Sequence, residues 1–231
     1  MNRIECISSM IAKNSISCDI GTDHGKVPIQ LEKMKSCKKI IATDISEKSL
    51  DKLRQFIEKN EEFQDRIQCR CGDGLQPIRP FEVDHIIITG LGGALIGEMI
   101  EGSLEVARSA DHMILQANNG RFYLRKLLHK NGFAIEREIN LYDKGKYYVL
   151  IKTIKNLEKY HYDYEYEYGK YLIDQKDPIL KEYLQLEIEK KEGIYHEIKD
   201  IRTKSSEERK KELKERIETI EMVLEKMEVE Q

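Results

Sequence analysis

The sequence has little net charge, few cysteines and no long apolar run, and each shortage excludes a class of protein. Among its 231 residues, 39 Lys and Arg nearly balance 42 Asp and Glu, which leaves a net charge of −3. Such a chain is not a wholly basic, histone-like nucleic-acid binder, although the balance allows a local basic face. No uninterrupted apolar stretch approaches the roughly 20 residues that span a bilayer, and Asn and Ser interrupt the first one, unlike a signal peptide. We therefore expect a soluble, cytoplasmic protein with no membrane partner.

Cysteine usage points to the same compartment. The five cysteines are odd in number and contain no Cys-x-x-Cys pair. Disulfide frameworks and structural zinc sites use paired spacings, so we expect free thiols in a reducing environment and no metal site.

Charge is distributed unevenly along the chain. Residues 155–231 carry 16 basic and 21 acidic side chains, whereas residues 1–154 carry 23 and 21. A tail that is nearly half charged is typical of exposed helices. We therefore predict a compact domain over 1–154 and a helical domain over 155–231.

Strand-like and helix-like segments alternate through the first domain. After a short amphipathic helix near the N-terminus, strands are predicted at 15–20, 39–44, 66–71, 84–89 and 112–116, mostly with helical segments between them. The alternation predicts βαβ units and a mostly parallel sheet. Two further strands, 133–142 and 146–154, flank the turn sequence Asp143-Lys144-Gly145, so we predict that the sheet ends in an antiparallel hairpin.

The tail contains two apolar seams with helical spacing. Leu213, Ile217, Ile220, Leu224 and Met227 are spaced 4, 3, 4, 3, as in a coiled coil. A less regular seam runs from Leu180 to Ile201, and Ser205 with Glu208 fits a capping box between the two. These patterns predict an α-helical, coiled-coil-like hairpin within one chain, and we expect a monomer.

The segment 160–168 alternates Tyr with acidic residues and has two interpretations. It could be a polar strand or linker, with the tyrosines packed on one side. It could also be an aromatic platform for bases. Because the interleaved acids would repel phosphates, the first interpretation is favoured.

Acidic residues follow three consecutive predicted strands. Asp19-Ile20-Gly21-Thr22-Asp23-His24-Gly25 joins the first strand to a helix, and such a glycine turn lets a ligand approach the backbone. Asp44 ends the second strand, where ribose hydroxyls are bound in such folds, and Asp73 follows the third. Fixed carboxylates suit a cationic adenosyl ligand better than an anionic pyrophosphate. The pattern therefore favours S-adenosylmethionine over a nicotinamide cofactor.

The loops after the fourth and fifth strands should meet the same edge of the sheet. Gly90-Leu91-Gly92-Gly93 would give backbone access, and Asn118 in Gln116-Ala117-Asn118-Asn119 offers donors and an acceptor to a base edge. Both stretches also fit ordinary turn chemistry.

Four motifs together resemble one bacterial family. Asp19–Gly25, Gly72-Asp73-Gly74-Leu75, the stretch 89–94 (Thr-Gly-Leu-Gly-Gly-Ala) and Gln116-Ala117-Asn118 occur in the order of the tRNA (adenine(22)-N1)-methyltransferases. The resemblance covers nearly the whole chain, although that family usually has Gln-Pro-Asn at the last motif. It implies a class I, Rossmann-like methyltransferase fold, the cofactor S-adenosylmethionine, and N1 of adenine 22 in the D-arm region of tRNA as the target.

The resemblance also implies site residues. The cofactor would contact the ends of the strands and the loops after them: Asp19, Gly21, Thr22, Asp23, His24, Asp44, Ile45, Asp73, Gly74, Gly90, Leu91 and Gly92. Asp23 is the first catalytic candidate and Asn118 the second. The substrate would contact Arg3, Lys26, Gln116 and Asn118. On the residues alone, the basic run of the tail that includes Lys204, Arg209 and Lys210 either holds phosphates or is a solvated helix face balanced by neighbouring glutamates. Two other functions stay open on the residues alone: a nicotinamide-dependent oxidoreductase, and a noncatalytic relative that binds RNA or a protein partner.

Overall fold

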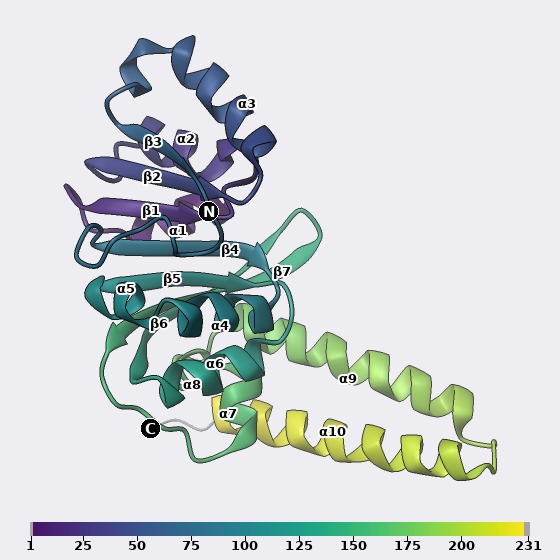
Figure 1. The fold of residues 1–231 in the computed structure, drawn as a ribbon. Helices are drawn as coiled ribbons and strands as arrows, with labels where there is room; N and C mark the ends of the chain where they lie inside the picture. The colour runs from purple at the N-terminus through teal and green to yellow at the C-terminus, as the bar shows by residue number, and fades with distance from the viewer. Residues whose placement is uncertain (1, 229–231) are drawn as a thin grey trace. The chain divides into compact units, whose positions relative to one another are not determined.

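The computed structural model describes residues 2–228 and contains one seven-stranded sheet (Figure 1). The strand order is β3-β2-β1-β4-β5-β7-β6. The strands are β1 Ile16–Ile20, β2 Lys39–Asp44, β3 Ile67–Cys71, β4 His85–Leu91, β5 His112–Ala117, β6 Phe133–Asp143 and β7 Lys146–Lys155. Strands β1 to β5 pair in parallel, whereas β7 pairs antiparallel with both β5 and β6. The predicted parallel sheet with a terminal hairpin is confirmed.

Six α-helices accompany the sheet among the described residues up to 159. They are α1 Arg3–Met10, α2 Lys26–Lys33, α3 Glu47–Glu58, α4 Gly93–Gly102, α5 Leu104–Ser109 and α6 Arg121–Lys130, with 3₁₀ turns η1 Asp23–Gly25 and η2 Glu61–Phe63. Their starts follow from local capping. The Asn2 side chain accepts the backbone N–H groups of Ile4 and Glu5, and Ser46 caps α3 as expected from the sequence.

Helices bury both faces of the sheet. Helices α1 and α2 pack against one face, which presents Ile40, Ile87 and Ile114. The neighbouring side chains Ile86 and Ile88 point to the other face and are also fully buried. Helices α4 and α6 pack on each other and against strands β4 to β6. Burial on both sides explains the uninterrupted Ile run of β4.

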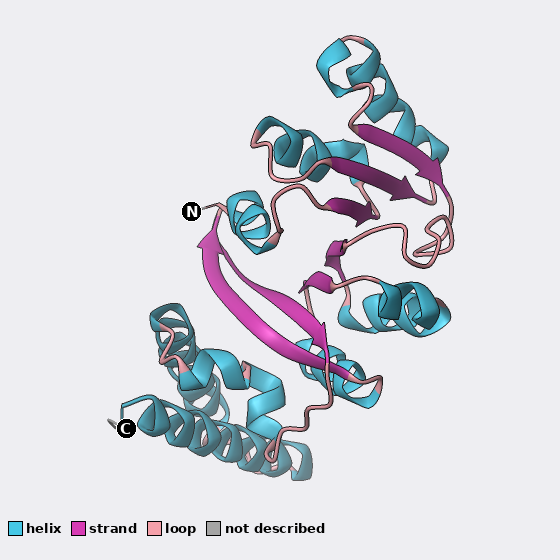
Figure 2. Ribbon diagram, turned by 90° about the vertical axis from the view of Figure 1, so that its left-hand side faces the viewer, coloured by secondary structure: helices cyan, strands magenta, loops and turns pink. Residues whose placement is uncertain are grey.

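The chain divides into two compact units, Met1–Lys159 and Tyr160–Gln231. The second unit contains α7 Asp163–Tyr168, α8 Lys170–Asp174, α9 Pro178–Ile198 and α10 Lys204–Glu228. Helices α9 and α10 form a hairpin (Figures 1 and 2) whose seam includes Leu180, Leu184, Leu213 and Ile220. None of the described helices is long and apolar enough to cross a membrane.

Three details of the tail differ from the sequence expectation. The Tyr-rich segment leads into the hairpin, as one expectation had it, but its residues Asp163–Tyr168 form helix α7 and not a strand, and the Glu165 carboxylate caps this helix by accepting the N–H groups of His161 and Tyr162. Helix α10 is capped by reciprocal hydrogen bonds between Thr203 and Ser206, not by Ser205 and Glu208. In its seam, Val223 is fully buried, whereas Leu224 is only half-buried.

Candidate active site

The strand order reverses direction between β1 and β4, and ligands of such sheets bind at the carboxyl ends of the strands beside this point. The loop after β1 is fastened there, since the N–H groups of Gly21 and Thr22 both donate to the Thr43 carbonyl at 2.9 Å. This places the first predicted motif beside the end of β2.

The next three residues adopt left-handed backbone conformations. Asp23, His24 and Gly25 have φ values of 36°, 58° and 73°. Each of the two non-glycine residues costs on the order of 1–3 kcal/mol, and such strain concentrates at functional sites. A larger residue in place of Gly25 would clash, because a Cβ there would lie 2.4 Å from Leu53 Cδ1.

Asp19 is a buried carboxylate at the end of β1. Its Oδ2 atom has no hydrogen-bond partner among the described residues, and only 2% of the residue is exposed. Burial raises the pKa of Asp19 to about 7, against the opposing influence of the neighbouring Thr22 hydroxyl and of the Arg3 cation. A buried carboxylate with one unpartnered oxygen at this edge is suited to receive a cation.

Asp44 lies at the end of β2 and is held by backbone donors. Its Oδ1 accepts from Ser46 N at 2.8 Å and its Oδ2 accepts from Asp23 N at 3.2 Å. Beside it, Ile45 is 72% exposed, which is unusual for an isoleucine. This combination offers acceptors to ribose hydroxyls and an apolar surface to an adenine ring.

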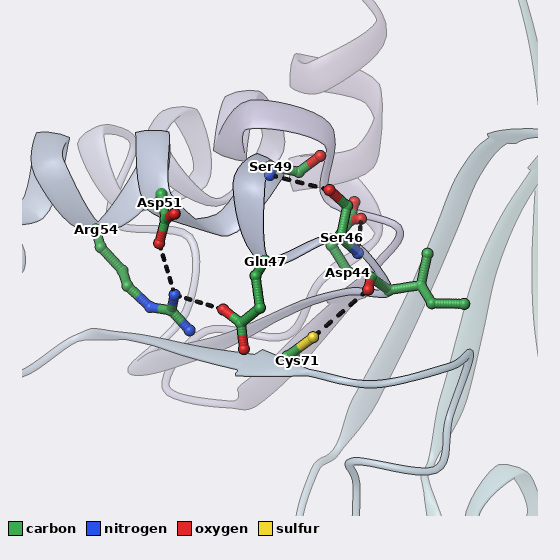
Figure 3. Close-up of polar contacts among 8 residues, drawn as sticks. Asp44, Ser46, Glu47, Ser49, Asp51, Arg54 and Cys71 are labelled. Carbon is green, nitrogen blue, oxygen red and sulfur yellow. Dashed lines mark hydrogen bonds and ion pairs between the residues drawn. The ribbon is translucent and has the colours of Figure 1, made fainter.

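Figure 3 shows a cluster beside Asp44 that sequence reasoning missed. The Arg54 guanidinium bonds Glu47 at 2.6 Å and Asp51 at 2.9 Å, and its presence lowers the pKa of Glu47. The exposed Cys71 thiol donates to the Ile45 carbonyl at 3.5 Å. Glu47, Asp51 and Arg54 meet because they share one face of helix α3. Cys71 joins them through the pairing of Asp44 with Cys71 in the β2–β3 register, which no local motif signals.

The third acidic residue, Asp73, lies in an exposed turn after β3. Gly74 follows with a φ of 51°, and both residues line a pocket that also includes Leu95, Glu98 and Met99. Asp73 thus lies at the same edge of the sheet as Asp19 and Asp44, as predicted.

A hydrogen-bond network joins Arg3, Gln116, Asn118 and the Gly90 loop. Gln116 is fully buried, and its Oε1 accepts from Arg3 Nη1 at 3.1 Å and from Gly90 N at 3.2 Å. Its Nε2 donates to Asn118 Oδ1 at 3.0 Å, and Asn118 Nδ2 donates to the Gly90 carbonyl at 2.6 Å. Arg3 also lies 5.5 Å from the Tyr148 ring centroid. The structure therefore unites three of the predicted substrate residues.

The network changes the role assigned to Gln116. Because this side chain is fully buried and forms three hydrogen bonds within the network, it positions its neighbours instead of touching a substrate. Asn118 is exposed, and each of its amide atoms can form one further hydrogen bond. The Gly90 backbone stays open, since a Cβ there would meet nothing within 4 Å; Leu91 and Gly92 follow it in the same loop.

Asp23, His24 and Lys26 lie on the exposed rim of the site. The Asp23 side chain is 71% exposed, and its Oδ1 lies 3.5 Å from His24 Nε2, which also contacts Lys52 Nζ at 3.3 Å. Asp23 and Asn118 follow β1 and β5, which are separated by β4, so their strands are about 10 Å apart. That spacing leaves room for a ligand between the two catalytic candidates.

The predicted tail cations are less available than expected. Lys210 is buried, and its Nζ donates to the Ile201 carbonyl at 2.9 Å and to Glu207 at 2.8 Å, which closes the turn between α9 and α10. Arg209 pairs with Glu212 at 2.6 Å, whereas Lys204 is exposed. A phosphate-binding role for Lys210 is thus poorly supported, because its charge is used within the turn.

Among the described residues, no set of side chains is arranged to bind a metal ion. No group of three or more His, Cys, Asp or Glu residues there could hold a metal ion. The site consists instead of carboxylates, glycine turns and amides.

The fold and the site define a class of protein. A nicotinamide-binding Rossmann sheet has the order 3-2-1-4-5-6, whereas here the antiparallel β7 is inserted between β5 and β6. With acidic residues after three consecutive strands, this is the architecture of a Rossmann-like methyltransferase. The chain belongs to the family described as "Methyltransferase domain", which matches residues 1–151.

Several individual proteins are similar to this chain over both of its units. A Bacillus subtilis (strain 168) protein named tRNA (adenine(22)-N(1))-methyltransferase is 28% identical over 96% of this chain and 95% of its own length. The crystal structure of the B. subtilis m1A22 tRNA methyltransferase TrmK is 25% identical, with a TM-score of 0.83 over 96% of this chain and 97% of that one. Streptococcus pneumoniae Sp1610 in complex with S-adenosyl-L-methionine is 28% identical, with a TM-score of 0.83 over 96% and 98%.

Proposed function

We propose that this protein transfers a methyl group from S-adenosylmethionine to N1 of adenine 22 in tRNA. The observation that carries the proposal is the match to the B. subtilis enzyme over nearly the full length of both chains. The acid-lined sheet edge of this chain supports it independently. We also propose that the protein acts in the cytoplasm as a monomer, as expected from its cysteine usage and its intramolecular helical hairpin.

The residues of the site fit an adenosyl cofactor. The unpartnered Oδ2 of Asp19 would receive the ammonium group of the methionine part. Asp44 would accept the ribose hydroxyls, and Ile45 and Asp73 would border the adenine. Gly21 and Gly90 would let the cofactor approach the backbone. When bound, S-adenosylmethionine supplies an electrophilic methyl group carried by a sulfonium.

The protein's contribution to the reaction is orientation and charge stabilisation. N1 of neutral adenine already carries a lone pair, so no residue has to remove a proton before transfer. The methylated base is cationic, and the exposed Asp23 carboxylate would stabilise the developing charge or accept from the exocyclic amine. Asn118 would hold the base edge, with its own orientation fixed by Gln116 and the Gly90 carbonyl.

The position of the target atom implies a change in the RNA. N1 lies on the pairing edge of adenine, so the nucleotide has to leave its stack before it can enter the site. Arg3 and Lys26 would contact the RNA, and exposed cations of the tail, such as Lys204, would hold phosphates.

Ligand binding separates this proposal from an oxidoreductase. By titration calorimetry, S-adenosylhomocysteine is expected to bind, whereas NAD shows no heat of binding at the same concentrations. Asp44→Ala should weaken S-adenosylhomocysteine binding at least about tenfold, since it removes charge-assisted hydrogen bonds. Asp65→Ala, a change of an exposed acid just before β3, should leave affinity unchanged.

Two results would contradict the proposal. Tighter binding of NAD than of S-adenosylhomocysteine would favour an oxidoreductase. Binding of both S-adenosylhomocysteine and tRNA without methyl transfer would favour a noncatalytic relative.

A further inference from the structure

The second unit contains an aromatic pair that the proposed reaction does not use. The rings of Tyr162 and Tyr164 stack with centroids 5.2 Å apart and planes inclined by 11°. Tyr162 is 57% exposed, which is high for an aromatic side chain in a stacked pair. A flat ring from another molecule could extend this stack at the Tyr162 side.

The acids of this segment do not block such a ligand. In a strand, the alternating sequence would place all of them along one face, but in helix α7 they are distributed around the axis. Glu165 is buried, and its carboxylate accepts the N–H groups of His161 and Tyr162. Neither Asp163 nor Glu167 lines the pocket beside the tyrosines. The repulsion of phosphates expected from the sequence is therefore largely absent.

Lysines line the same pocket as the two tyrosines. Lys226 Nζ lies 5.7 Å from the centroid of the Tyr164 ring. Lys170 and Lys176 line the same pocket, and the one further acid there, Asp174, is paired with Lys170. The charged residues that line the pocket are therefore three lysines and two acids, Glu165 and Asp174.

The pocket has the size of a single-ring site. Its volume is about 280 Å³, just below the range of roughly 300–1,000 Å³ typical of pockets for larger small molecules. Stacked aromatics beside lysines are the combination with which proteins hold unpaired nucleotides, the ring by stacking and the phosphate by charge.

We propose that Tyr162, Tyr164 and Lys226 form a binding site for one unpaired nucleotide of the RNA substrate, with the base stacked on Tyr162 and the adjoining phosphate near Lys226. The site lies wholly within the second unit. This proposal rests on the proposed function in one respect only, that the RNA substrate is tRNA.

The first test compares tyrosine variants of the full chain. Equilibrium binding of fluorescently labelled, unmodified tRNA is measured by anisotropy, without S-adenosylmethionine. Tyr162→Ala should weaken binding about five- to tenfold, the lower end of the effect of losing one base stack. Tyr162→Phe keeps the ring and should bind within about twofold of the parent. Tyr142→Ala is the matched control, because Tyr142 is also 57% exposed and paired with a ring, that of Tyr147.

The second test examines the phosphate contact. Lys226→Ala should reduce the slope of log affinity against log salt by about 0.7, as expected for one contact to a single strand. Lys33→Ala is the control, since Lys33 lies 5.9 Å from the Phe56 ring centroid in the first unit. It should leave the slope unchanged.

Several results would overturn the site. They are equal tRNA binding by Tyr162→Ala and Tyr142→Ala with both proteins folded by circular dichroism, an equal loss in Tyr162→Phe, or an unchanged salt slope in Lys226→Ala. Submillimolar, Tyr162-dependent binding of free AMP without an effect on tRNA would assign the pocket to a mononucleotide instead. These assays measure binding and not methyl transfer. If tRNA binding depends on Tyr162 but no methyl group is transferred, the nucleotide site stands and the proposed reaction is refuted.

Discussion

At the residue scale, cofactor binding depends most on the carboxylate of Asp19 near the end of β1. Its carboxylate is buried, one oxygen has no partner among the described residues, and burial raises its pKa to about 7. A cationic ligand would supply the missing partner and favour the charged form. The same carboxylate that binds the ligand should therefore weaken the fold of the free protein.

Asp19→Asn tests this opposition. Between the unfolded pKa of about 3.9 and the folded pKa of about 7, the native state binds more protons than the unfolded state, so native stability falls as pH rises. Asparagine does not ionise, so the variant avoids this loss of stability. It should have a higher melting temperature than the parent at pH 8, with a smaller difference at pH 5. Its affinity for S-adenosylmethionine should fall about 10- to 100-fold, as expected when a charged partner is lost.

The pH dependence of binding gives the same test a second readout. Affinity of the parent should rise roughly eightfold from pH 6 to pH 7.5 as Asp19 ionises, whereas that of Asp19→Asn should stay flat. Asp65→Asn, a change at an exposed acid, serves as control. A variant that is destabilised at pH 8, or that binds as tightly as the parent, would contradict this role for Asp19.

At the scale of elements, Gln116 connects three segments that are far apart in sequence. Through one buried amide it joins α1 to the loops after β4 and β5, over a separation of 113 residues to Arg3. Removing the amide would break three hydrogen bonds to groups of exposed or half-buried residues, each worth about 0.5–1.5 kcal/mol. The loops that face the reacting atoms would then lose their fixed positions.

Gln116→Leu should therefore reduce the rate more than it reduces cofactor binding. We expect kcat for tRNA methylation to fall at least about tenfold, while the Kd for S-adenosylhomocysteine changes less than about threefold. Gln68→Leu is a matched control, because Gln68 is an exposed glutamine on strand β3. An unchanged kcat in folded Gln116→Leu, or an equal loss in Gln68→Leu, would show that the amide does not position the site.

The elements also show which parts of the structure the sequence predicts. Strands β1 to β5 and the hairpin were predictable because two-sided burial leaves apolar runs such as Ile86–Ile88, and because Asp-Lys-Gly specifies a turn. Helix α7 was not, since its alternating tyrosines match a strand and its start depends on the Glu165 carboxylate. The internal bonding of Gln116 and Lys210 was also missed, because their partners follow from chain packing and not from spacing along the sequence.

At the scale of the whole molecule, the two units carry different parts of the account. The carboxylates, glycine turns and amide network that support cofactor binding and methyl transfer all lie in the first unit. The second unit supplies the helical hairpin and the Tyr162 pocket, which are surfaces suited to RNA. The match to the B. subtilis enzyme extends over both units, so we expect both units to serve one activity, with tRNA as its substrate.

The central claim is most directly tested by methyl transfer to two tRNA transcripts that differ only at position 22. The protein is incubated with S-adenosylmethionine and either transcript, adenine or guanine at that position, and the digested nucleosides are analysed by mass spectrometry. The account predicts 1-methyladenosine from the adenine transcript and none from the guanine transcript. Equal 1-methyladenosine from both transcripts, or none from either while S-adenosylhomocysteine still binds, would contradict it.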